Sequence, residues 1–217
     1  MLRACAMAAV AALLFTPAAF AANNASGDAQ KLVDDSTGVV AQVRKDPHFV
    51  DLMKRAKGVF ILPASGKGAF IVGGGGGQGV LIAHENGHWS DPAFLSLGSI
   101  SIGAQAGGEG GPLVMLLMTD KALHDFTQAN NLSLNANAGL TIINYSAKGQ
   151  GSVGKGDIVV WSNRSGAFAG ASVSATDITS NTNEDHAYYG EQASTEQIIA
   201  GHAHNRGAAK LVDELPA

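Results

Sequence analysis

Residues 84–88 read His-Glu-Asn-Gly-His and match the HExxH pattern of zinc metalloproteases at every fixed position. In those enzymes a helix places both histidines on one face, where they bind one metal ion while the glutamate acts on the bound water. Here the middle residues are Asn86-Gly87, a strong sequence pattern for a two-residue hairpin turn, because both turn positions need positive φ. The flanking runs GVLIAHE and HWSDPAF have the composition of strands.

In the hairpin that this turn predicts, Glu85 pairs with His88, and His84 pairs with Trp89. Successive side chains of a strand alternate between its two faces, so His84 and His88 would point to opposite sides of the sheet. They could not then share a zinc ion, and a third ligand would have to come from Glu109 in the glycine-rich run GGEGGP. We therefore interpret the segment as a polar hairpin tip and predict no metal site.

Two glycine-rich segments look like nucleotide-binding loops. Residues 149–155 fit GxxxxGK, although Gly156 stands where a serine or threonine would bind magnesium, and residues 73–79 contain GxGxxG. A phosphate-binding loop must open a helix, whereas these segments lead into the strand-like runs DIVVWS and VLIAH. We interpret the first as a strand connection, and the glycines of the second as a bulge or a close contact between strands.

The other polar residues form no convergent catalytic set. Asp177, Glu184 and Asp185 offer carboxylates for calcium but match no calcium-loop spacing, and we predict that the run SNTNEDH is a surface loop. His202 and His204 are predicted to be solvated residues of a C-terminal helix. We therefore predict no catalytic residues and no cofactor from these motifs.

The elements that carry these residues follow from periodicity and glycine content. Residues 28–57 predict two amphipathic helices divided at Pro47. After Gly58, short apolar runs separated by some of the chain's 28 glycines predict antiparallel strands, interrupted by a short helix capped by Thr119. Ser194, with a glutamine three residues later, opens a last helix. We expect an α+β fold, an antiparallel, strongly bent sheet or barrel-like sandwich with N- and C-terminal helices packed on it.

The first 21 residues predict a cleaved secretory signal peptide, with Arg3 before an apolar run and small residues at 19 and 21; an uncleaved anchor is the alternative. We expect a short flexible N-terminus over residues 22–28 and a single domain over residues 29–217. The only cysteine, Cys5, precedes the cleavage point, so the mature chain would have no disulfide. This organisation favours export to a bacterial periplasm or the extracellular space.

Basic residues are concentrated near the start of the mature chain, although the net charge of −4 gives no indication of nucleic-acid binding. On amphipathic helices such residues can contact anionic lipid headgroups. An ordinary solvated face is the alternative, since four acidic residues lie among them: Asp34, Asp35, Asp46 and Asp51. The cluster holds seven of the 14 lysines and arginines: Lys31, Arg44, Lys45, Lys54, Arg55, Lys57 and Lys67.

Several segments, taken in order, resemble the SYLF domain family: AKGVFILP, the glycine-rich strands, the turn GHWSDP, the run GAFAGAS and the terminal YYG. The resemblance covers roughly residues 29–217. It implies a non-enzymatic domain that binds phosphoinositide-containing membranes or, in fungal relatives, actin filaments, and this chain looks like a secreted bacterial single-domain member. It also implies that the basic N-terminal segment faces the membrane, which points to Lys54, Arg55 and Lys57.

We therefore expect binding of anionic lipid through Lys54, Arg55, Lys57, Lys67, Arg44 and Lys45. The alternative is a structural or host-interaction protein of the bacterial cell envelope, and actin binding by family analogy ranks after it. Hydrolase activity is the least favoured possibility, because no convergent set of catalytic residues is present.

Overall fold

The fold begins with two helices that meet at Pro47. The computed structural model describes residues 18–63, 77–102, 111–134, 139–145, 156–162, 173–190 and 193–217. Helix α1 spans Ala18–Val43 and α2 spans Pro47–Met53. The carboxylate of Asp46 accepts hydrogen bonds from the amides of His48 and Phe49, and proline fits the first helical turn, so the predicted division at Pro47 is confirmed.

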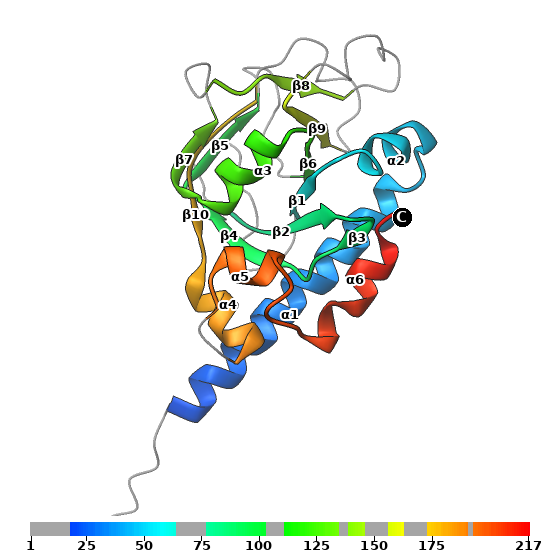
Figure 1. Cartoon of the computed structure of the whole chain (residues 1–217). Helices are drawn as coiled ribbons and strands as arrows, with labels where there is room; N and C mark the ends of the chain where they lie inside the picture. The colour runs from blue at the N-terminus through cyan, green and yellow to red at the C-terminus, as the bar shows by residue number, and fades with distance from the viewer. Residues whose placement is uncertain are drawn as a thin grey trace, which may run out of the picture.

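Helix α1 starts earlier than the sequence pattern indicates. It includes residues 22–28, which we expected to precede the first helix, and its N-terminal turns extend beyond the rest of the molecule (Figure 1). The predicted cleavage point after Ala21 lies within this helix, while residues 1–17 lie outside the described part of the chain. Signal-peptide cleavage therefore stays a prediction. Among the described residues, none of the helices is long and apolar enough to cross a membrane.

The described strands form one ten-stranded sheet in the order β5-β10-β4-β2-β1-β6-β9-β8, with β3 paired to β2 and β7 paired to β10. The sheet curls strongly, and helices from both ends of the chain pack on it (Figure 1). This confirms the predicted α+β fold. The strands are β1 (Gly58–Leu62), β2 (Gly77–Glu85), β3 (His88–Trp89), β4 (Ala93–Leu97), β5 (Ser99–Ile102), β6 (Leu113–Leu117), β7 (Asn130–Leu134), β8 (Ile142–Asn144), β9 (Ile158–Ser162) and β10 (Val173–Ser180).

One strand pair departs from the antiparallel arrangement that we predicted. β8 runs parallel to β9, with Ile142 opposite Ile158 and Asn144 opposite Val160, and the sheet is therefore mixed. A parallel pair needs a connection of about a dozen residues or more to bring the chain back to the same end. The segment between Asn144 and Ile158 is long enough for that return.

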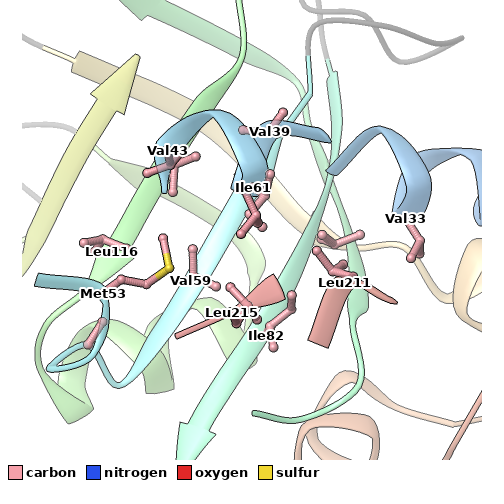
Figure 2. Close-up of a cluster of buried hydrophobic side chains, with 14 of the residues drawn as sticks. Val33, Val39, Val43, Met53, Val59, Ile61, Ile82, Leu116, Leu211 and Leu215 are labelled. Atoms are coloured by element: carbon pink, nitrogen blue, oxygen red, sulfur yellow. The ribbon is translucent and has the colours of Figure 1, made fainter. Parts of the chain in front are cut away.

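The core lies on both faces of the sheet. All five residues of β1 are buried, and they alternate between two clusters of apolar side chains. Val59 and Ile61 face the layer of α1, α2 and α6 (Ala209–Glu214), whose valines and leucines surround them in Figure 2. Phe60 faces the opposite cluster and lies 5.7 Å from Phe126 of α3 (Asp120–Thr127), measured between ring centroids. Burial on both faces explains why this strand reads as a continuous apolar run.

The helix caps predicted from the sequence are present. Thr119 accepts a hydrogen bond from the amide of Ala122 at the start of α3. At the start of α5 (Thr195–Ile199), Ser194 and Gln197 form the predicted capping box, in which each side chain accepts a hydrogen bond from the other residue's amide.

Two predictions about the C-terminal third are wrong. The run SNTNEDH is largely helical, because it enters α4 (Thr182–Tyr189), which Asn181 caps and Gly190 ends with a φ of 73°. The predicted C-terminal helix does not include His202 and His204, since α5 ends at Ile199 and Gly201 adopts a φ of 77°. Both histidines are exposed, and the chain then forms a short 3-10 helix (Arg206–Ala208) before α6.

Strand packing is tightest at Gly79, where β2 crosses β1. A Cβ atom at this position would lie 2.5 Å from the carbonyl oxygen of Ile61 and 2.6 Å from the ring of Phe60. This confirms a close contact between strands at one of the glycines of the run at residues 73–79. The run leads into β2 and not into a helix, as predicted, while residues 73–76 and 149–155 lie outside the described residues.

We expect Gly79→Ala to lower the free energy of unfolding by about 1–3 kcal/mol, because backbone atoms of β1 would have to move to admit a methyl group. Urea denaturation followed by circular dichroism would measure the change. Gly38→Ala is the matched control, since a Cβ at Gly38 of α1 would meet nothing within 4 Å. That control should gain about 0.5–1 kcal/mol. Equal changes in the two variants would contradict this account of Gly79.

Candidate functional site

The HExxH segment forms the hairpin that its sequence predicts. Asn86 and Gly87 have φ angles of 52° and 79°, and the register pairs His84 with Trp89 and Glu85 with His88. The two histidines therefore belong to alternate faces of the hairpin. Over the ranges that the structure describes, no three potential ligand side chains gather as a metal site would require, while Glu109 lies outside them.

We define residues 44–57 as the basic segment. The hairpin contacts this segment directly. The amide of His84 donates to the carbonyl of Lys57 at 2.8 Å, and its ring Nδ1 lies 3.2 Å from the carbonyl oxygen of Ala56. The His84 ring stacks on the indole of Trp89, with centroids 4.2 Å apart and planes inclined by 12°. Trp89 is therefore held beside the end of the basic segment.

Two of the predicted lipid-binding cations form ion pairs with distant parts of the chain. The Arg44 guanidinium lies 2.7 Å from the carboxylate of Glu214 and also donates to the Glu214 carbonyl. The Lys57 ammonium lies 3.3 Å from the carboxylate of Asp120. Surface ion pairs of this kind contribute about 0–1 kcal/mol to stability, but they reduce the positive charge that the two residues offer to a ligand.

The other three described residues of the predicted lipid-binding set remain available to bind an anionic ligand. Lys45, Lys54 and Arg55 are exposed, and within the described residues none of them forms an ion pair. The Arg55 Nε donates to the backbone carbonyl of Asp51, which orients the side chain without neutralising it. Lys67, the sixth predicted residue, lies outside the described part of the chain. Of the five described residues of the predicted set, three thus form no ion pair in the described structure and two are paired with an acidic side chain.

Helix α2 is fixed beneath these cations by aromatic packing. Phe49 lies edge-on to Tyr145, with ring centroids 4.9 Å apart, and 6.2 Å from the ring of Trp161. The Tyr145 hydroxyl donates to the carboxylate of Asp46 at 2.8 Å, and burial together with this bond raises the pKa of the tyrosine. The residue that caps α2 is therefore tied to the end of β8.

Asp185 is a described carboxylate whose pKa rises to near neutrality. Burial in α4 raises the pKa from 3.8 to about 7, opposed by the hydrogen bond that its Oδ1 accepts from the amide of Phe94, while the charge of Glu184 raises it further. The side chain is fully buried, and its Oδ2 has no hydrogen-bond partner. The carboxyl group therefore joins α4 to β4 and has no access to a substrate. Sequence reasoning missed this role because Asp185 stands in a polar run.

Two tyrosines at the end of α4 connect this helix to neighbouring segments. The Tyr189 hydroxyl donates to the carbonyl of Pro92, and the Tyr188 carbonyl accepts from the side-chain amide of Asn205. Burial raises the pKa of both tyrosines above their ordinary value. The Tyr189–Pro92 hydrogen bond thus joins the YYG and WSDP segments of the family resemblance.

Comparison with known proteins matches residues 98–217, more than half of the chain, to the model of the Ysc84 family, described as Las17-binding protein actin regulator. The chain belongs to the Ysc84 family. This confirms the SYLF resemblance, and the family description names binding and regulation and no reaction, in agreement with a non-enzymatic protein. The matched range includes α4, whereas the basic segment and the residues at 91–94 that contact the C-terminal third lie before it.

Relatives of this Ysc84-family chain occur in yeasts and in mammals. It is 28% identical over 157 residues to LAS seventeen-binding protein 3 of Saccharomyces cerevisiae, covering 70% of the chain and 34% of that protein. It is 27% identical over 156 residues to Protein YSC84 of the same organism, with 69% and 33% covered. It is 25% identical over 154 residues to human SH3 domain-containing YSC84-like protein 1, with 69% and 45% covered. The chain thus spans about a third of the length of the yeast relatives.

The raised pKa of Asp185 predicts an uncommon pH dependence of stability. Because the folded state holds this proton up to about pH 7 and the unfolded state only to about pH 4, stability from this group falls as the pH rises between those values. In the unmodified protein this group should lower the free energy of unfolding by on the order of 2 kcal/mol between about pH 5 and pH 7, and we expect Asp185→Asn to lack that decrease. Urea midpoints of both proteins across this range would measure it, and parallel curves would contradict the assignment.

Proposed function

We propose that this Ysc84-family chain is a non-enzymatic binding module that attaches to anionic lipid surfaces, including those that contain phosphoinositides, through Lys45, Lys54 and Arg55. The proposal is carried by the exposure of these three cations on one short segment, without ion pairs in the described structure. The segment holds five basic residues against the acidic Asp46 and Asp51. Asp46 keeps its negative charge while it accepts hydrogen bonds from Tyr145 and from the start of α2, so the positive surface rests on the excess of basic residues in the segment.

The strength of such binding follows from the number of free cations. Each basic residue near an anionic membrane contributes about 1 kcal/mol, and the contribution falls as salt screens the surface potential. Three available cations thus support reversible attachment at low salt. Arg44 and Lys57 add less than their charge indicates, because Glu214 and Asp120 hold them.

We expect Lys54→Glu/Arg55→Glu to weaken binding to acidic vesicles by about thirtyfold or more, since two contacts of about 1 kcal/mol each are lost and replaced by repulsion. Flotation with phosphatidylcholine vesicles, with and without phosphoinositide, at low salt would measure this. Unchanged binding of the variant would contradict the proposed site, and no binding of the unmodified chain would contradict the proposed function.

A matched control is available beside the middle of α1, away from the basic segment. Arg206→Glu/Lys210→Glu makes the same change in net charge at two exposed residues. Gly207, between them, accepts a hydrogen bond from Gln30, which places this region about 20 Å along the helix from Val43. The control variant should bind vesicles as the unmodified chain does, so that site and bulk charge are separated.

Actin-filament binding is a second candidate, favoured by the family description as an actin regulator. Co-sedimentation with actin filaments, in the absence of lipid, would test it with the same pair of variants. The proposal of export, with residues 1–21 as a signal peptide and a periplasmic or extracellular location, favours lipid or an envelope or host protein as the partner over actin. N-terminal sequencing of the exported chain would test that location.

A further inference from the structure

Both tryptophans of the chain lie beside the basic segment. Trp161, on β9, is 6.2 Å from the ring of Phe49 in the first turn of α2. Phe49 in turn contacts Tyr145, whose hydroxyl binds Asp46 immediately after Lys45. Trp161 therefore lies at the start of the basic segment.

Trp89 lies at the other end. Its indole stacks on His84, which is bonded to the backbone at Ala56 and Lys57. The indole N–H donates to the carbonyl of Pro216 at 2.9 Å, so the ring plane is fixed from both sides. The available cations Lys54 and Arg55 immediately precede the residues that hold this stack.

Each tryptophan is partly buried and keeps some surface in contact with solvent. Both pack against the apolar cluster that α1, α2 and α6 cover, and Met118 packs there as well. The backbone carbonyl of Leu117, just before Met118, accepts a hydrogen bond from the amide of Lys57. Partly exposed apolar side chains thus accompany the cations along the segment.

This combination fits a lipid–water interface better than an acidic protein surface. Indole rings concentrate at the headgroup level of membranes, since they are apolar in body and polar at the N–H, and lysine and arginine extend their charges to the phosphates beside them. Attraction to an acidic protein would need only the cations. Burial of partly exposed rings in a bilayer also contributes a favourable free energy of about 25 cal/mol per Å² of apolar surface.

We infer that Trp89 and Trp161 are the interfacial contacts of the membrane-binding surface, entering the headgroup region beside Lys45, Lys54 and Arg55. This inference rests on the proposed function and extends it, because it adds an apolar contribution to the electrostatic one. Salt then weakens vesicle binding without abolishing it, since screening acts on the cations and not on the rings. The two contacts also orient α2 along the membrane plane.

The two single-tryptophan proteins, Trp89→Phe and Trp161→Phe, test the inference, because each leaves one indole as the only tryptophan emission. They would be mixed with acidic vesicles that contain phosphatidylcholine brominated at shallow or deep acyl positions. In both proteins we expect a shift of emission to shorter wavelength and stronger quenching by the shallow label. Phenylalanine preserves most of the packing, and a circular dichroism melt would confirm that each variant is folded.

The outcomes separate the two proposals. Vesicle-bound protein with unquenched tryptophans would overturn the interfacial contacts and leave the electrostatic site in place. Quenching of one indole alone would overturn the inference that both tryptophans enter the headgroup region. Absence of vesicle binding would overturn the proposed function together with the inference. The same emission shift on actin filaments without lipid would assign the aromatic surface to a protein partner and overturn the inference.

Discussion

The burial of β1 on both faces is the constraint on which the rest of the structure depends. A strand with two buried faces needs a layer of apolar side chains on each side, which α1, α2 and α6 supply on one face and α3 supplies on the other. Close packing also leaves no room for a side chain at Gly79. The position of α2, and with it the basic segment, follows from the need to cover this strand.

The C-terminal segment completes the same layer and affects the surface charge. Leu211 and Leu215 are buried against the helices of the N-terminal segment (Figure 2), and this docking brings Glu214 to Arg44 and the Pro216 carbonyl to Trp89. Apolar burial is the larger contribution, because fully burying a leucine is worth about 1.5–3 kcal/mol whereas an exposed ion pair is worth about 0–1 kcal/mol. The charge pattern of the surface is thus a consequence of core packing.

Membership of the Ysc84 family and the geometry of the basic segment bear on function in different ways. The family match covers residues 98–217, which include Asp185 and Tyr188 of α4, while Phe94, whose amide donates to Asp185, lies before that range. The candidate binding surface is built from the basic segment and the β2–β3 hairpin, which precede the matched range, together with Trp161, which lies within it.

Much of the fold could be predicted from local sequence. Asn86-Gly87 determines its hairpin because both positions need positive φ, and Asp46-Pro47, Thr119 and the Ser194–Gln197 pair determine helix starts because their hydrogen bonds are made within one turn. Those interactions depend on residues a few positions apart, so the sequence by itself was enough.

Only the tertiary structure decided the features that need distant partners. Asp185 stands in a polar run, and its burial depends on an amide 91 residues away in β4. The parallel pairing of β8 and β9 depends on the path of a long connection. Arg44 and Lys57 form ion pairs because the fold brings Glu214 and Asp120 to them, whereas Lys54 and Arg55 stay without an ion pair in the described structure. Charge and hydropathy patterns carry no information on such contacts, because the patterns are local and the contacts are set by how the layers pack.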